Sequence, residues 1–175
     1  MCGLLYTNTK SDENEFLKAL RKMDHRGPDA SDHYFYNQHK FGHNRLKILD
    51  LNDASNQPFF SDDTRYLIIY NGEIFNFKEL AEQHKLDLQT TSDTEVLLKL
   101  YIKFGKEMLN MLNGMFAFVI YDKKKDDLFI ARDRLGIKPL YIYENGDRII
   151  VSSEINAILH LREENKVDEI GKRQY

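Results

Sequence analysis

Residues 115–131, MFAFVIYDKKKDDLFIA, show what kind of sheet this chain builds, because two apolar runs flank a short charged segment. The runs 115–121 and 128–131 are rich in the aromatic and β-branched side chains that strands favour. The charged residues between them, KKKDD at 123–127, are few enough to form a hairpin connection. We therefore predict two strands that pair antiparallel.

The same pattern extends along the chain in both directions. A second turn signal, NGD at 145–147, separates two further apolar runs and predicts a second hairpin. The runs with strand character are 3–7, 33–36, 47–51, 66–70, 115–121, 128–131, 140–143 and 149–152. Strands therefore outnumber helices, and the recurring hairpins favour antiparallel sheets with helices as a cover.

Two segments have helical spacing instead. In residues 12–23, DENEFLKALRKM, the apolar side chains recur every three or four residues behind an acidic start. Residues 92–104 begin with Ser92 and have Glu95 three residues later, which is the pattern of a capping box, and they stop before Gly105. Both segments predict helices with one apolar face.

The composition limits the class of protein. A length of 175 residues, 42% of them apolar, suits one globular domain with its own core. The net charge is −3 and the 25 basic residues are dispersed, so nucleic acid is not an expected partner. No apolar run approaches the ~20 residues that cross a bilayer, so no membrane association is expected. A single cysteine favours a reducing compartment and a cytoplasmic location.

The single cysteine, Cys2, directly follows Met1. Methionine aminopeptidase favours a small second residue, and removal of Met1 would leave a thiol and a free α-amine on the same residue. An α-amine has a pKa of ~7.7–8.0, so near neutral pH it can accept the thiol proton. Position alone leaves open the alternative that Cys2 is a buried apolar residue that opens a strand.

Cys2 is accompanied by further motifs along the chain. In order, they are MCG at 1–3, HRGPD at 25–29, GHNRLKILDL at 42–51, YNGEIFN at 70–76, SDTEV at 92–96, LNGMFAF at 112–118 and ARDRLGIKPLY at 131–141. The series resembles the class II glutamine amidotransferase domain, a member of the N-terminal nucleophile hydrolases, in the form found in glutamine-dependent asparagine synthetases. Motifs in a matching order are far more specific than one short pattern.

The resemblance implies a catalytic set of three residues. Cys2 would be the nucleophile, with its own amine as the base. Asn71 and Gly72 would form the oxyanion hole, since a side-chain amide and an unobstructed backbone N–H can point together at the developing negative charge. Outside the family context, Asn71 and Gly72 would instead be the turn of a hairpin.

The resemblance also implies a pocket for L-glutamine, whose carboxylate and ammonium require a fixed cation and fixed anions. The planar guanidinium of Arg45 suits the carboxylate. The residues that follow it would contribute mainly through their backbone: Leu46, Lys47, Ile48 and Leu49. Glu73 and Asp93 would hold the ammonium. The plainer alternatives are a solvated acid for Glu73 and a first-turn helix acid for Asp93.

The histidines receive no catalytic or metal-binding role. His25, in HRGPD, precedes a rigid Gly-Pro turn and is expected to be structural. His39 and His43 stand four residues apart, but Gly42 argues against a helix that would place them on one face, so no metal site is expected.

The last motif, at 131–141, should shape the second sheet and the surface that faces a partner domain. Its charged residues, Arg132, Asp133 and Arg134, are expected to pair with one another. The sequence after Arg45, together with QPF at 57–59 and SSEINAIL at 152–159, is of the asparagine-synthetase type and differs from the phosphosugar branches of the class.

The resemblance implies an α+β fold, a four-layer α/β/β/α sandwich of two antiparallel sheets. Residues 1–160 would be the glutaminase domain, and 161–175 the start of a linker to an ATP-dependent synthetase domain, whose SGGxDS-type pyrophosphate loop does not occur in these residues. That domain would use ATP and Mg, and residues 1–160 would need no cofactor. The expected partners are L-glutamine, the synthetase domain in the same chain and a second copy in a homodimer.

Two other classes of function stay open. A different N-terminal nucleophile hydrolase, one that cleaves peptides or another amide, could use the same cysteine. Such an enzyme would not need the cation Arg45 and the anions Glu73 and Asp93, which would bind the carboxylate and the ammonium of a free amino acid. A regulatory domain without activity would follow if Met1 were retained, because the basic amine would then not exist.

Overall fold

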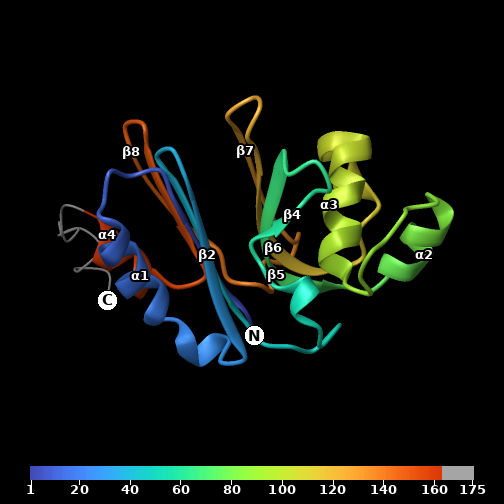
Figure 1. Ribbon diagram of the computed structural model, residues 1–175, viewed down its shortest axis with the longest axis horizontal. Helices are drawn as coiled ribbons and strands as arrows, with labels where there is room; N and C mark the ends of the chain where they lie inside the picture. Colours follow the sequence, from blue (N-terminus) through green and yellow to red (C-terminus); the bar gives the residue numbers. More distant parts are fainter. Residues whose placement is uncertain (163–175) are drawn as a thin grey trace.

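The computed structural model describes residues 1–162. Two antiparallel sheets face each other at the centre, and helices cover the outer side of each sheet (Figure 1). The α/β/β/α order of layers confirms the predicted α+β sandwich. Residues 163–175, which hold nearly all of the predicted linker, lie outside the described residues.

The first sheet has five strands in the order β2-β3-β1-β9-β8. Their bounds are β1 Gly3–Thr7, β2 Ala30–Tyr36, β3 His39–Arg45, β8 Tyr141–Asn145 and β9 Arg148–Ser152. Each strand pairs antiparallel with its neighbours. The β8–β9 hairpin lies where the NGD turn predicted it.

The second sheet has four strands in the order β4-β5-β6-β7. Their bounds are β4 Phe59–Phe60, β5 Tyr66–Ile74, β6 Gly114–Asp122 and β7 Asp127–Arg132. The hairpin predicted from residues 115–131 is confirmed as β6–β7, with Asp122 opposite Asp127.

Helices α1 and α4 cover the first sheet, and α2 and α3 lie outside the second (Figure 1). Their bounds are α1 Glu13–Arg21, α2 Phe77–Gln83, α3 Asp93–Phe104 and α4 Ile155–Leu161, and the short 3-10 turns are η1 Asp24–Arg26, η2 Asp53–Ser55 and η3 Gly105–Asn110. Both predicted helices are present as α1 and α3. Helix α3 ends at Gly105, whose φ of +59° favours glycine.

Three apolar layers hold the sandwich together. Alternate side chains of a strand point to opposite faces, so Leu4 and Tyr6 of β1 enter the core between the sheets while Leu5 packs under α1 and α4. Strand β5 does the same, with Leu67 between the sheets and Ile68 under α3. Both faces of these strands are therefore buried, which explains their continuous apolar sequences.

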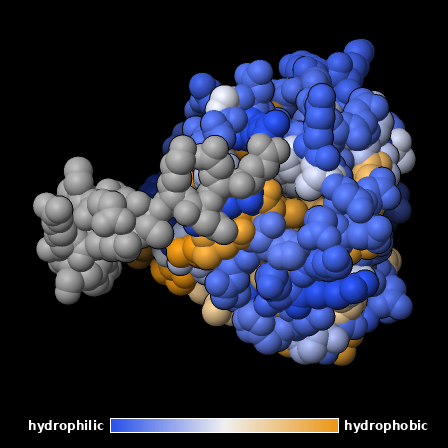
Figure 2. Space-filling model, turned by 90° about the vertical axis from the view of Figure 1, so that its left-hand side faces the viewer, coloured by the Kyte–Doolittle hydropathy of each residue, from blue (hydrophilic) through white to orange (hydrophobic). Residues whose placement is uncertain are grey.

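The outer surface on the α1 and α4 side is mainly hydrophilic and includes an apolar area (Figure 2). Exposed apolar side chains of α4 include Ile155 and Leu159. Within residues 1–162 the structure has no helix of the length and apolar character that a bilayer crossing requires.

Some local predictions were wrong. Residues 47–51 are a loop, not a strand, because the Arg45 side chain binds the carbonyls of Leu49 and Asp50 and folds this segment back on itself. The strand is the preceding segment, His39–Arg45. Its polar composition concealed it, although all seven of its residues are buried.

The sequence-based prediction missed two helices. Helices α2 and α4 have seven residues each, too short for a clear helical period in the sequence. Leu161, the first residue of the predicted linker, is still the last residue of α4 and is buried.

Candidate active site

A cavity of about 100 Å³ lies at one end of the sandwich, where strands from both sheets meet. Cys2 stands just before β1, Arg45 ends β3, and Asn71 belongs to β5 of the other sheet. The predicted site residues that line it are Cys2, Arg45, Leu46, Ile48, Leu49, Asn71, Gly72, Glu73 and Asp93. Lys47 does not line it. Its ammonium reaches Asp53 Oδ1 at 2.6 Å instead.

The thiol of Cys2 is held by the backbone of Leu46. The Leu46 N–H donates to Sγ at 3.4 Å, and the thiol can donate to the Leu46 carbonyl at 3.8 Å. Burial is the main effect on Cys2 and raises the pKa of its thiol, although the Leu46 N–H partly offsets it. The thiol is therefore protonated at neutral pH, and a nucleophilic role requires a base.

The base would be the α-amine of Cys2, but Met1 is bonded to that nitrogen. It lines the same cavity, and its peptide bond to Cys2 removes the α-amine from residue 2. Met1 is 55% exposed. Removal of Met1 would free the amine beside Sγ and enlarge the mouth of the cavity.

Asn71 and Gly72 lie within strand β5, opposite Ala117 and Phe116 of β6, so the hairpin-turn alternative is wrong. Asn71 is 1% exposed, and its Nδ2 has no hydrogen-bond partner among residues 1–162. A Cβ at Gly72 would lie 2.4 Å from the Met115 carbonyl oxygen, so only glycine fits. A buried amide donor without a partner is costly, and one that lines the same cavity as a thiol is suited to an oxyanion.

Arg45 is buried and organises the loop that follows it. Its Nη1 donates to the Asn52 carbonyl at 2.9 Å and to Asn56 Oδ1 at 2.7 Å. Its Nη2 donates to the carbonyls of Leu49, at 3.2 Å, and Asp50. A bound carboxylate must therefore share or replace some of these acceptors.

Asp93 is the first residue of α3 and reaches the cavity from the second sheet's side. Its Oδ2 accepts from the Tyr70 hydroxyl at 2.7 Å and from the Ile74 N–H at 3.0 Å. Burial raises the pKa of Asp93, and these two bonds counteract it. Asp93 thus has both the first-turn position and a place in the cavity wall. Glu73 lines the wall from β5.

Further lining residues had no role in the sequence-based prediction. They include Gln57, Tyr70, Thr94, Met115 and Lys138. Gln57 is buried, accepts from the Tyr70 N–H at 2.6 Å, and donates to Thr94 Oγ1 at 3.4 Å. The QPF motif contained Gln57, but only the fold shows that it joins β5 to α3.

The charged residues of the 131–141 motif do not pair with one another as predicted. Arg132 donates to the Gly136 and Lys138 carbonyls, and Arg134 donates to that of Leu109. Asp133 is buried and accepts the backbone N–H groups of Phe116, Leu135, Ile137 and Lys138. The motif therefore fixes a loop that carries Lys138 to the cavity.

The histidines lie outside the cavity lining. His25 contacts Glu154 at 2.8 Å and is largely exposed. His39 lies at the opposite end of β3 from Arg45. His43 is buried with Nε2 2.9 Å from the Tyr70 carbonyl, so Nε2 donates. Residues 1–162 contain no group of three or more acidic, histidine or cysteine side chains that could hold a metal ion.

The family model that matches this chain is the glutamine amidotransferase domain, and the match covers residues 1–175. This chain belongs to that family. Among its relatives, the glutamine amidotransferase domain is 39% identical to asparagine synthetase [glutamine-hydrolyzing] 1 of Bacillus subtilis, with 100% of the chain and 29% of that protein covered. It is 42% identical to asparagine synthetase B of Escherichia coli, over 82% of the chain and 26% of that protein. The domain thus spans less than a third of these relatives.

Solved structures share the fold of this glutamine amidotransferase domain. The glutamine phosphoribosylpyrophosphate amidotransferase of B. subtilis has a TM-score of 0.77 at 24% identity, over 90% of the chain and 43% of that structure. A second structure, described as the allosteric regulatory enzyme of purine biosynthesis, has a TM-score of 0.74 at 22% identity, over 91% of the chain and 43% of that structure. These neighbours confirm the N-terminal nucleophile hydrolase fold.

Proposed function

We propose that this domain hydrolyses L-glutamine to glutamate and ammonia through a thioester on Cys2. The observation that carries the proposal is the Asn71 Nδ2, a buried donor without a partner in the wall of the cavity that holds the thiol. The relatives named as glutamine-hydrolysing asparagine synthetases support the choice of substrate.

The proposed reaction needs Cys2 as the N-terminal residue. Its amine takes the Sγ proton, and the thiolate attacks the side-chain amide carbon of glutamine. The Asn71 amide and the Gly72 N–H stabilise the resulting oxyanion. The tetrahedral intermediate expels ammonia, which takes a proton from the amine, and leaves a thioester. Water, deprotonated by the same amine, then releases glutamate and restores the thiol.

The substrate contacts follow from charge. Arg45 would bind the glutamine carboxylate with the loop residues Leu46, Lys47, Ile48 and Leu49 beside it, and Glu73 and Asp93 would bind the ammonium. Lys47 would take part through its backbone, since its side chain points to Asp53. No step of this hydrolysis transfers electrons or needs a metal-activated water, so the domain would work without a cofactor.

The ammonia would be used by another domain of the longer natural protein. The relatives extend well beyond the length of this chain, so we propose a synthetase domain in the same natural protein that uses ATP and Mg to activate aspartate or another carboxylate. A homodimer is part of the same proposal. We also propose a cytoplasmic location, because a thiol nucleophile must stay reduced.

The test is glutamate release by the chain after Met1 has been removed. We expect turnover of L-glutamine, and at least a 10³-fold loss in Cys2→Ala, since that variant lacks the nucleophile. The same chain with Met1 retained should be equally inactive, because its residue 2 has no free amine. Appreciable glutamate release by either inactive form would refute the mechanism. A chain with Met1 removed that releases no glutamate would overturn the proposed function.

A further inference from the structure

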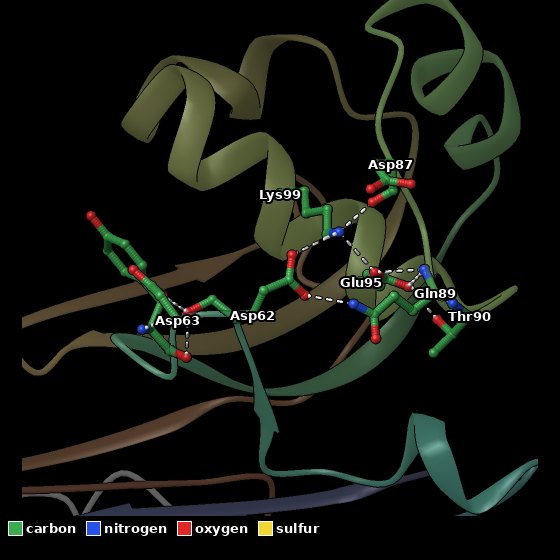
Figure 3. Close-up of polar contacts among 9 residues, drawn as sticks. Asp62, Asp63, Asp87, Gln89, Thr90, Glu95 and Lys99 are labelled. Carbon is green, nitrogen blue, oxygen red and sulfur yellow. Dashed lines mark hydrogen bonds and ion pairs between the residues drawn. The ribbon is translucent and has the colours of Figure 1, made fainter.

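A polar network connects α3 with the segment that leads into it (Figure 3). Glu95 and Lys99 stand one turn apart on α3. Around them lie Asp62, from the β4–β5 connection, and residues 87–90. None of these residues lines the cavity, so the proposed chemistry does not account for the network.

Glu95 is the buried centre of this network, with 1% of its surface exposed. Its carboxylate accepts the Gln89 N–H at 3.0 Å, and the N–H and hydroxyl of Thr90 at 2.7 Å each. Burial alone would raise the pKa of Glu95, but the hydrogen bonds from Gln89 and Thr90 outweigh it and lower the pKa. The carboxylate is therefore charged and is fixed by several donors.

Lys99 links this carboxylate to two other segments. Its ammonium lies 3.1 Å from Glu95 Oε1 and 3.3 Å from Asp62 Oδ2, and it also donates to the Asp87 carbonyl. The Gln89 side chain donates to Asp62 Oδ1 at 3.2 Å (Figure 3). Residues 87–90 are thus clamped between α3 and the β4–β5 connection.

The clamped segment continues directly into the cavity wall. The Thr91 N–H donates to Asp50 Oδ2 at 2.9 Å, and the Asp50 carbonyl accepts from Arg45. Ser92, the next residue, caps α3 at the Thr94 N–H, and Asp93 follows. One short segment therefore supports both the Arg45 loop and Asp93.

Glu95 differs from an ordinary capping-box glutamate. In a capping box the glutamate accepts the N–H of the N-cap residue itself and stabilises the helix end. Here the carboxylate reaches past Ser92 to Gln89 and Thr90, while the Ser92 N–H lies 3.3 Å from Thr90 Oγ1. Its bonds fix the incoming chain, which is the part that contacts the Arg45 loop.

We propose that Glu95, assisted by Lys99, is a positioning residue for the glutamine pocket. It holds residues 87–91 in place, and these set the relative positions of Asp93 and, through Asp50, of Arg45. The inference rests on the proposed function. The two groups bind opposite ends of the same amino acid, so a displacement between them weakens glutamine binding while leaving the Cys2 chemistry intact.

The experiment compares Glu95→Gln with Glu15→Gln in the chain lacking Met1. Glu15 is a matched control, because it is also a helical glutamate bonded to a lysine, but it is only partly buried and lies on α1. We expect Glu95→Gln to raise KM for glutamine about ten-fold with kcat within about two-fold, and Glu15→Gln to change neither. Thr90→Val removes one donor to Glu95 together with the acceptor of the Ser92 N–H, and it should raise KM about three-fold.

A purely structural role would give a different result. It would lower the melting temperature and the active fraction, so kcat would fall at unchanged KM, and that outcome would overturn the proposal. If Glu95→Gln does not fold, Thr90→Val and Lys99→Met distinguish the two roles in the same way, by whether KM or kcat changes. Calorimetry on the Cys2→Ala background should show the same weakening of glutamine binding. If the wild-type chain releases no glutamate, the proposed function itself fails, whatever Glu95 does.

Discussion

The two ends of the β-sandwich use the same strands in opposite ways. Near the cavity, β3 and β5 leave buried polar atoms without partners, namely His43 Nδ1 and Asn71 Nδ2. Native proteins satisfy nearly all buried polar groups, so such exceptions require a reason. For Asn71 the reason is a proposed ligand, which would accept from its Nδ2.

At the opposite end the polar groups are paired and the two sheets are tied together. The Tyr6 hydroxyl and His39 Nδ1 are 2.8 Å apart, and His39 Nε2 lies 2.9 Å from Asp126 Oδ1, which also accepts from Tyr121. The ammonium of Lys123 lies over three aromatic rings, those of Tyr34, Tyr36 and Phe60. This opposite end, the closed end, supplies stability, and this allows the cavity end to keep polar atoms without partners.

The largest change in activity is expected from Asn71→Ala, at the cavity end. Loss of an oxyanion donor should lower kcat for glutamine by about 10²- to 10³-fold. The melting temperature should stay the same or rise slightly, because the substitution removes a buried donor that has no partner. Steady-state glutamate release and thermal unfolding measure the two quantities. A variant that melts earlier but keeps its kcat would show that Asn71 is structural.

The pH dependence of unfolding tests His43, the other residue of β3 and β5 with a buried polar atom that has no partner among residues 1–162. Burial lowers the pKa of His43 from 6.5 to about 4. The unfolded chain therefore takes up a proton below about pH 6.5 that the folded protein refuses until about pH 4, so stability falls as the pH drops through this range. The loss from this one histidine should reach roughly 3 kcal/mol.

His43→Gln keeps a donor for the Tyr70 carbonyl and should flatten the free energy of unfolding between pH 6.5 and 4. His33→Gln, at an exposed histidine of β2, is the control and should leave the slope unchanged. Urea titrations at several pH values give the slopes. Equal slopes for the two variants would contradict a buried neutral His43.

Asp122→Asn should affect only the closed end. Arg65 donates to both Asp122 oxygens, at 2.9 and 2.5 Å, and this pair is the main reason why the pKa of Asp122 is lowered to about 2. Its loss should cost about 2 kcal/mol of unfolding free energy, since Arg65 is only partly exposed. KM and kcat should not change. A change in either constant would mean that the two ends are coupled.

The sequence predicted those helices and strands whose sequence signals lie within a few neighbouring residues. The β6–β7 hairpin and helix α3 are defined by alternation, a turn and a cap within a few neighbouring residues. Strand β3 was missed because Lys40, His43 and Asn44 look like surface residues, and only tertiary contacts such as His43 to the Tyr70 carbonyl explain their burial.

The site was predictable to a different degree. Cys2, Asn71 and Asp93 were named from motifs, and the fold brings them to one cavity. Their chemical roles stay predictions. Gln57 and Lys138 could not be found, since their place in the wall depends on how distant loops fold. The sequence also could not show that Arg45 donates to carbonyls of its own loop, because backbone carbonyls have no residue-specific signature in a sequence.

The most direct test of Cys2 as the nucleophile is the intact mass of the chain after treatment with a diazo-ketone analogue of glutamine. We expect one covalent adduct per chain, located on Cys2, and only in molecules that have lost Met1. Excess L-glutamine should protect the thiol, while Asn71→Ala should slow the labelling. Labelling of molecules that retain Met1, or no labelling of Cys2 after Met1 is lost, would contradict the claim that Cys2 and its own amine form the catalytic pair.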